Sequence, residues 1–158
     1  MSADPVIFKL DRDADGLELA RRWVEMPRPG GFLSLLKARP VEIERGMMRV
    51  ICDVDVGHSN FVHLVHGGVT VGLTDIAGGG AAMTLLKPGE TLLTTDLTTR
   101  FLDAAPIETK QLEATGRVSF QSGRRVVVAV EIKGDRGVVI SQGSVGVTIR
   151  APRVEAGA

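Results

Sequence analysis

The residues best suited to chemistry lie in one stretch of the chain, residues 58–83. Within it, Val69, Leu73 and Ile76 recur at steps of three and four, which predicts a helix with one apolar, buried face. Asp75 lies on the opposite face, as a lone carboxylate among mostly small residues. A carboxylate held in this way can act as a general base or as a nucleophile. A merely solvated or capped Asp75 would give the same pattern.

The start of this predicted helix offers a second chemical group, the backbone amides of His66-Gly67-Gly68. First-turn amides have no acceptors inside a helix and lie at the positive end of its dipole, so they suit an anion or a polarised carbonyl oxygen. Gly68 and Asp75 are seven residues apart, which is about 10 Å along a helix axis. One helix cannot easily bring both to the same carbonyl, so we expect two neighbouring subunits to contribute them.

Four glycines inside the same helix also need a reason, since each costs about 1 kcal/mol relative to alanine. They are Gly72, Gly78, Gly79 and Gly80. Something must approach the helix backbone closely, and the sequence leaves open whether this is a packed sheet, a second helix or a ligand.

The spacing of these motifs resembles that of a known family. His58-x-Asn60, His66-Gly67-Gly68 and Leu73-x-Asp75 are similar to the signature of hotdog-fold acyl-CoA thioesterases of the PaaI-like (phenylacetate-degradation) group. The resemblance covers about residues 38–150 and continues through Thr94-x-Asp96 and Phe101. It departs at His63, where the family usually has glycine, so the shape of that loop is in question.

The resemblance implies hydrolysis of an acyl-CoA thioester to a free acid and coenzyme A. The amide of Gly68 would polarise the thioester carbonyl, and Asp75 of the neighbouring subunit would activate water or attack directly. Asn60 would orient the carbonyl or the water, and Thr94 would help to hold the water. His66 either contacts substrate or only braces the start of the helix.

Further substrate contacts are expected from Gly67, Arg124 and Arg125. The two arginines follow a predicted hairpin turn and suit the phosphates of coenzyme A, although a solvated turn explains them equally well. No cofactor is expected, since coenzyme A is part of the substrate. The resemblance also implies a homodimer, and a homotetramer built as a dimer of dimers.

Length and composition fit a single domain spanning residues 1–158. The sequence is 44% hydrophobic, with 19 basic residues balanced by 19 acidic ones. The chain therefore has no net positive charge that would attract nucleic acid or an anionic membrane. The apolar runs are far shorter than the ~20 residues that a membrane span needs. The first residues lack the order of a signal peptide, and we expect a cytoplasmic protein.

Other kinds of active site fit the sequence poorly. His58, His63 and His66 do not have the spacing of a zinc site, and no metal is expected. Cys52 alternates with Met48 and Val50 and is interpreted as a core residue. Around Ser144, Gln142 stands where a serine hydrolase elbow needs glycine. The glycine run 78–80 falls inside a helix, unlike a phosphate loop.

Two alternative functions remain. The chain could be a hotdog module that binds or senses acyl-CoA without cleaving it, although binding alone does not need Asp75. A hydratase of the same fold would need histidine five residues after Asp75, where this chain has Gly80. The acyl group is not specified, but five Phe, one Trp and no Tyr favour aliphatic over aromatic substrates.

The periodic segments predict an α+β fold, in which a long antiparallel sheet wraps a central helix. A helix is expected at residues 11–26 and a short apolar turn or helix at residues 32–36. Strands are expected at residues 41–45, 47–55, 91–102, 110–120, 125–133 and 138–150. In the strand 110–120 we expect Leu112, Ala114, Val118 and Phe120 to point inward. Open sheet edges are usually paired or covered, which favours edge pairing between subunits.

Overall fold

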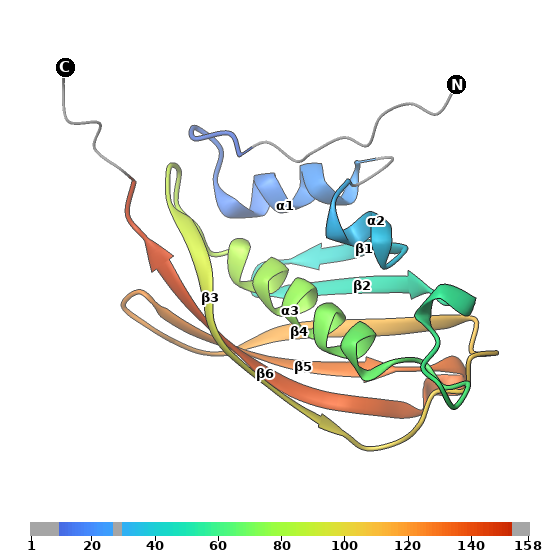
Figure 1. The fold of residues 1–158 in the computed structure, drawn as a ribbon. Helices are drawn as coiled ribbons and strands as arrows, with labels where there is room; N and C mark the ends of the chain where they lie inside the picture. The colour runs from blue at the N-terminus through green and yellow to red at the C-terminus, as the bar shows by residue number, and fades with distance from the viewer. Residues whose placement is uncertain (1–9, 27–29, 153–158) are drawn as a thin grey trace, which may run out of the picture.

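In the computed structural model, which describes residues 10–26 and 30–152, one curved sheet encloses a central helix. Figure 1 shows the sheet curling around α3, with α1 beside it. The elements in chain order are α1 (Gly16–Val24), α2 (Phe32–Leu35), β1 (Ala38–Glu44), β2 (Met47–Asp53), a 3-10 turn (Val56–His58), α3 (Gly67–Met83), β3 (Thr91–Phe101), β4 (Gln111–Ser122), β5 (Arg125–Lys133), a second 3-10 turn (Asp135–Gly137) and β6 (Val139–Arg150). This confirms the predicted hotdog arrangement.

The strand order of the six-stranded sheet is β1-β2-β4-β5-β6-β3, and all neighbouring strands are antiparallel. β1 and β3 are therefore the edges. α1 packs against β1 and α3. The outer edge of β3 has no partner strand within the described residues, so its backbone groups on that side stay available for pairing.

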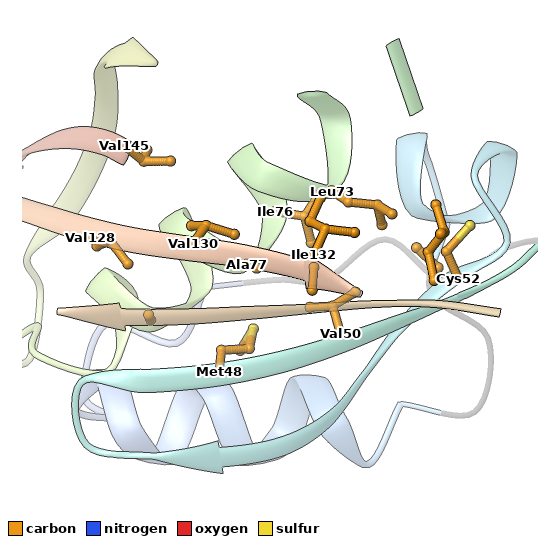
Figure 2. Packing of buried hydrophobic residues seen from close by; sticks show 14 of the residues in the cluster. Met48, Val50, Cys52, Leu73, Ile76, Ala77, Val128, Val130, Ile132 and Val145 are labelled. Atoms are coloured by element: carbon orange, nitrogen blue, oxygen red, sulfur yellow. The ribbon is translucent and has the colours of Figure 1, made fainter. Parts of the chain in front are cut away.

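The core lies between α3 and the concave face of the sheet. Leu73 and Ala77 of α3 are fully buried among side chains from several strands, as Figure 2 shows. A Cβ atom added at Gly78 would lie 2.5 Å from Val145 Cγ2, and one added at Gly80 would overlap the sulfur of Met48. The sheet thus packs directly on the helix backbone, which requires glycine at these two positions.

The predicted elements are present in the predicted order, and their ends differ by a few residues. The first helix begins at Gly16, later than expected, because the Asp15 side chain caps it by accepting a hydrogen bond of 2.9 Å from the Glu18 amide. Pro27 and Pro29, which come directly after the expected helix 11–26, lie outside the described residues. Within the described residues, no helix is long and apolar enough to cross a membrane.

The prediction that Phe120 points inward is wrong. A β-bulge interrupts the pairing of β4 with β5 between Val118 and Phe120, which shifts the side-chain alternation beyond it. Leu112 and Ala114 are buried as predicted and Val118 is half-buried, whereas Phe120 is 53% exposed.

Candidate active site

Asp75 of α3 and Thr94 of β3 are brought together at the surface of the molecule. The Thr94 hydroxyl donates a hydrogen bond of 2.8 Å to Asp75 Oδ1. Asp75 is exposed, and its Oδ2 accepts no hydrogen bond from the described residues. Thr94 therefore fixes the orientation of the carboxylate and leaves one oxygen open to water or a ligand.

A second β-bulge aims Thr94 at the helix. The pairing of β3 with β6 shifts between Thr94 and Asp96, so Thr94 lies opposite Val147. Val147 is buried on the concave face, and directly opposed residues of antiparallel strands share a face. If the strand alternated regularly back from Leu97, which lies opposite the buried Val145, Thr94 would fall on the outer face and could not reach Asp75.

A pocket of about 450 Å³ opens beside Asp75 and Thr94. Its lining residues are mainly apolar: Leu10, Trp23, Asp75, Ile76, Gly79, Gly80, Met83, Leu86, Thr91, Leu92 and Thr94. A hollow of about 720 Å³ elsewhere includes Arg49, Glu42 and Glu113 on its walls. There the arginine is paired with both carboxylates, so the smaller pocket, with an open carboxylate oxygen, is the better candidate for catalysis.

At the start of α3, His66 acts as the helix N-cap. Its Nδ1 accepts a hydrogen bond of 2.8 Å from the Gly68 amide, which requires the neutral ring with its proton on Nε2. The Gly68 amide, predicted to polarise a carbonyl, is therefore already engaged. The Gly67 amide has no acceptor among the described residues. The Phe101 ring lies over Gly67, where an added Cβ would be 3.0 Å from Phe101 Cζ.

Asn60 organises the loop that leads to α3. Its Oδ1 accepts hydrogen bonds from the amides of Val62 at 2.9 Å and Leu64 at 3.0 Å, while its Nδ2 has no acceptor in the described structure. His63, in the same loop, has a φ of 60°. This left-handed conformation is the one that glycine adopts most easily, which explains the glycine usual in the family. His63 thus keeps the loop shape that a glycine would give.

His58 and Cys52, neither of which was expected to bind a metal or to act as a nucleophile, lie in structural positions. His58 is buried, and its Nδ1 accepts a hydrogen bond of 3.0 Å from the Asp55 amide. Among the described residues, no group of three or more His, Cys, Asp or Glu side chains is arranged to hold a metal ion. Cys52 is fully buried, and burial, with smaller contributions from Asp53 and Asp55, raises its pKa to about 11. Cys52 is a core residue, as predicted.

The structure does not bring Arg124 and Arg125 to Asp75. Arg124 lies in the turn between β4 and β5, Arg125 is the first residue of β5, and both are exposed. Since Val126 points into the core, Arg125 lies on the outer face of the sheet. Their predicted role in phosphate binding therefore needs a ligand, or a second subunit, that reaches this end of the sheet.

The amide and carboxylate also remain apart within one chain. Gly67 and Asp75 lie eight residues apart on α3, or ~12 Å along its axis. Gly68, Val71 and Asp75 form an exposed stripe on the helix, which faces away from the core. A single subunit thus presents both groups on one surface without joining them at one site.

Sequence reasoning singled out Gly79 without deciding between a packed element and a ligand, and it missed Trp23 and Met83 as residues that shape the pocket. Met83 follows Gly79, and Gly79 follows Asp75, at intervals of four, so helical spacing alone could have placed Met83 on the same side of the helix. No comparable signal links Trp23, on a separate helix, to Asp75.

Comparison with known proteins agrees with the fold and gives the family of the chain. The thioesterase superfamily matches residues 63–141, half of the chain, which includes Asp75 and Thr94. No curated protein sequence matches the chain.

Several solved structures share the fold. A thioesterase from Haemophilus influenzae has a TM-score of 0.76 at 16% identity, covering 89% of this chain and 94% of its own. The Escherichia coli PaaI protein of the phenylacetic acid degradation operon has a TM-score of 0.69 at 20% identity, with coverages of 76% and 84%. A hypothetical thioesterase from Streptococcus pneumoniae, solved with coenzyme A, has a TM-score of 0.68 at 20% identity, with coverages of 77% and 93%. The chain belongs to the thioesterase superfamily and has the hotdog fold that it shares with PaaI.

Proposed function

We propose that this protein hydrolyses the thioester bond of an acyl-CoA, releasing a free acid and coenzyme A. The observation that carries the proposal is the Thr94–Asp75 hydrogen bond at the mouth of a mainly apolar pocket. It orients a carboxylate with one open oxygen where a carbonyl and a water molecule can enter. Membership of the thioesterase superfamily supports the same chemistry.

Asp75 can open the thioester by two routes. As a general base, it takes a proton from water while the water oxygen bonds to the carbonyl carbon. As a nucleophile, it bonds to that carbon itself and forms a mixed anhydride, which water then cleaves. In both routes the carbon–sulfur bond breaks, the sulfur leaves with the electron pair, and the thiol of coenzyme A is released after protonation.

A backbone amide at the start of α3 would stabilise the charge that develops on the carbonyl oxygen. We assign this role to Gly67, because its amide lacks an acceptor among the described residues, whereas the Gly68 amide would first have to release His66 Nδ1. One such donor typically lowers the barrier by ~2.7–4 kcal/mol. The side-chain amide of Asn60 would orient the carbonyl or the water through Nδ2, which has no acceptor among the described residues.

We further propose that the complete site forms between two subunits. The open edge of β3 can pair with the same strand of a second copy. Exposed apolar side chains lie at the β3 end near α3 and in the loop before α3, namely Phe61, Val62, Phe101 and Leu102. Their burial would favour a homodimer that brings Gly67 of one subunit to Asp75 of the other. A homotetramer built from two such dimers stays a prediction.

The test is thiol release from acyl-CoAs of short, long and aromatic acyl groups. Asp75→Asn keeps the size of the side chain and removes its basicity, so we expect turnover to fall by ~10²–10⁴-fold. Thr94→Val should also lower turnover, whereas Thr94→Ser, which keeps the hydroxyl, serves as its matched control.

Binding of a non-hydrolysable thioether analogue of acyl-CoA, measured by calorimetry, separates catalysis from folding. We expect Asp75→Asn to bind the analogue about as well as the wild type. If wild type and variant both bind acyl-CoA and neither releases thiol, the protein is a binding module and the proposed activity is wrong.

A further inference from the structure

Gly79 is the one interior glycine of α3 that packing leaves unexplained. An added Cβ would meet Phe32 and Leu36 at Gly72, Val145 at Gly78 and Met48 at Gly80, in each case at 3.0 Å or closer. At Gly79 the same atom would have no atom of the described residues within 4 Å. Glycine weakens a helix at this position without serving the contact between helix and sheet.

The open space beside Gly79 is the pocket that starts at Asp75. Both residues line it, and they lie four positions apart, one turn along the same side of α3. The bare backbone of Gly79 therefore forms part of the pocket wall directly beyond the carboxylate. A side chain at this position would project into the pocket.

The pocket follows the helix away from the carboxylate. Its lining runs from Asp75 to Met83, eight residues or ~12 Å along the axis. Leu86 and Leu92 add further apolar wall, and Trp23 is the only aromatic side chain that lines the pocket among the described residues. Mainly aliphatic walls that extend along the helix suit a chain of methylene groups better than a ring.

From this we infer that Gly79 is a specificity-determining residue, which leaves room for an unbranched aliphatic acyl chain to run from Asp75 toward Met83. The inference rests on the proposed thioesterase activity and names the acyl class of its substrate. With carbon–carbon bonds of ~1.5 Å, an extended chain advances ~1.25 Å per methylene. A pocket ~12 Å long thus accommodates a chain of about nine or ten carbons.

Graded substitution of Gly79 tests the inference. We expect Gly79→Ala, Gly79→Val and Gly79→Leu to lower progressively the ratio of kcat/KM for decanoyl-CoA to kcat/KM for butyryl-CoA. The ratio should fall by about tenfold or more for Gly79→Leu, and the preferred acyl chain should become shorter. Gly79→Ala should raise Tm, because alanine favours the helix and meets no neighbour, so a loss of long-chain activity cannot be ascribed to unfolding.

Val71→Leu is the matched control. Val71 lies on the same exposed side of α3, one turn before Asp75, and does not line the pocket. Added bulk at this position should leave the ratio of long-chain to short-chain activity unchanged.

The outcomes separate this inference from the proposed function. If the wild type hydrolyses acyl-CoAs and the ratio is the same in all Gly79 variants, the role of Gly79 is overturned and the thioesterase activity stands. If phenylacetyl-CoA is the preferred substrate and aliphatic thioesters are poor ones, the aliphatic assignment is overturned. If no acyl-CoA releases thiol, both proposals fall together.

Discussion

His63 holds a backbone conformation that disfavours any side chain. Its φ of 60° lies in the left-handed region, which costs a residue with a Cβ about 1–2 kcal/mol. The amide of His63 donates to the Asn60 carbonyl, and its carbonyl accepts from the Ile107 amide, so the loop holds it there. The strain is stored beside Asn60, where it serves the shape of the proposed site.

His63→Gly should therefore stabilise the protein. We expect the free energy of unfolding, measured by urea titration, to rise by ~0.5–1 kcal/mol, because relief of strain outweighs the greater freedom of glycine in the unfolded chain. His63→Ala, which removes the imidazole and keeps the Cβ, should give no such gain. Equal stabilisation by both substitutions would show that the imidazole, and not the backbone, is the source of the strain.

Cys52 should be unreactive in the folded protein. Its thiol donates to the Leu36 carbonyl oxygen at 3.0 Å, and with a pKa of about 11 only about one thiol in a thousand is ionised at pH 8. We expect alkylation by iodoacetamide at pH 8 to be slow in the native state and fast in denaturant. Rapid alkylation of the native protein would contradict the core position of Cys52.

The raised pKa of Cys52 also makes the free energy of unfolding depend on pH. The folded state raises the pKa of Cys52 from 9.0 to about 11, so folding favours the protonated thiol. This contribution is complete below pH 9 and is lost as the pH rises from 9 to 11. Cys52→Ala should show a smaller loss of stability over this alkaline range than the wild type, in urea titrations at a series of pH values.

At the scale of elements, two β-bulges decide which side chains face the helix. The bulge in β3 directs Thr94 to Asp75, and the bulge in β4 turns Phe120 outward. Sequence periodicity predicted both strands, because their β-branched and apolar residues alternate over most of their length. It could not predict the bulges, because a strand with one extra residue has the same kinds of residue as a regular strand. The extra residue nevertheless reverses which side chains beyond it face the helix.

Other parts of the site escaped prediction for a similar reason. The glycine pair and the start of α3 are visible in the sequence as a break in the apolar pattern. The His66 ring decides which backbone amide is left without an acceptor, because its Nδ1 accepts a hydrogen bond from the Gly68 amide. The spacing of residues in the sequence does not reveal the orientation of a side chain. The pocket wall from α1 depends on tertiary packing of separate elements in the same way.

Removing one residue from β3 tests the bulge directly. Deletion of Thr95 should restore regular pairing with β6 and leave Thr94 opposite Val147, so that the hydrogen bond to Asp75 is kept. We therefore expect thiol release to stay within roughly threefold of the wild-type rate, because the catalytic group keeps its alignment. Thr95→Ala keeps the bulge and removes only an exposed hydroxyl that bonds to Asp96, so it should retain activity. If the deletion variant folds and its thiol release falls by roughly tenfold or more, the bulge serves catalysis in a way that the direction of Thr94 does not explain.

At the scale of the whole molecule, the separation between the Gly67 amide and the Asp75 carboxylate along α3 predicts that the active site needs two subunits. Gly67 and Asp75 lie ~12 Å apart on one helix, so a carbonyl that contacts both must lie between two copies of α3. Gly67 is the first residue of the helix, a position that tolerates proline. Gly67→Pro removes the amide hydrogen there, and Gly67→Ala adds a similar Cβ beneath Phe101 while the hydrogen is kept.

Mixing two inactive variants should restore activity if each site needs two subunits. We expect Gly67→Pro and Asp75→Asn to be nearly inactive alone, with Gly67→Ala much less impaired than Gly67→Pro. After joint unfolding and refolding of equal amounts, half of the dimers are mixed and each mixed dimer holds one intact site, so thiol release should recover to about a quarter of the wild-type rate. Sites contained within one subunit would show no recovery, because neither chain carries both groups intact. The size of the recovery therefore measures how the amide and the carboxylate are shared between the two chains.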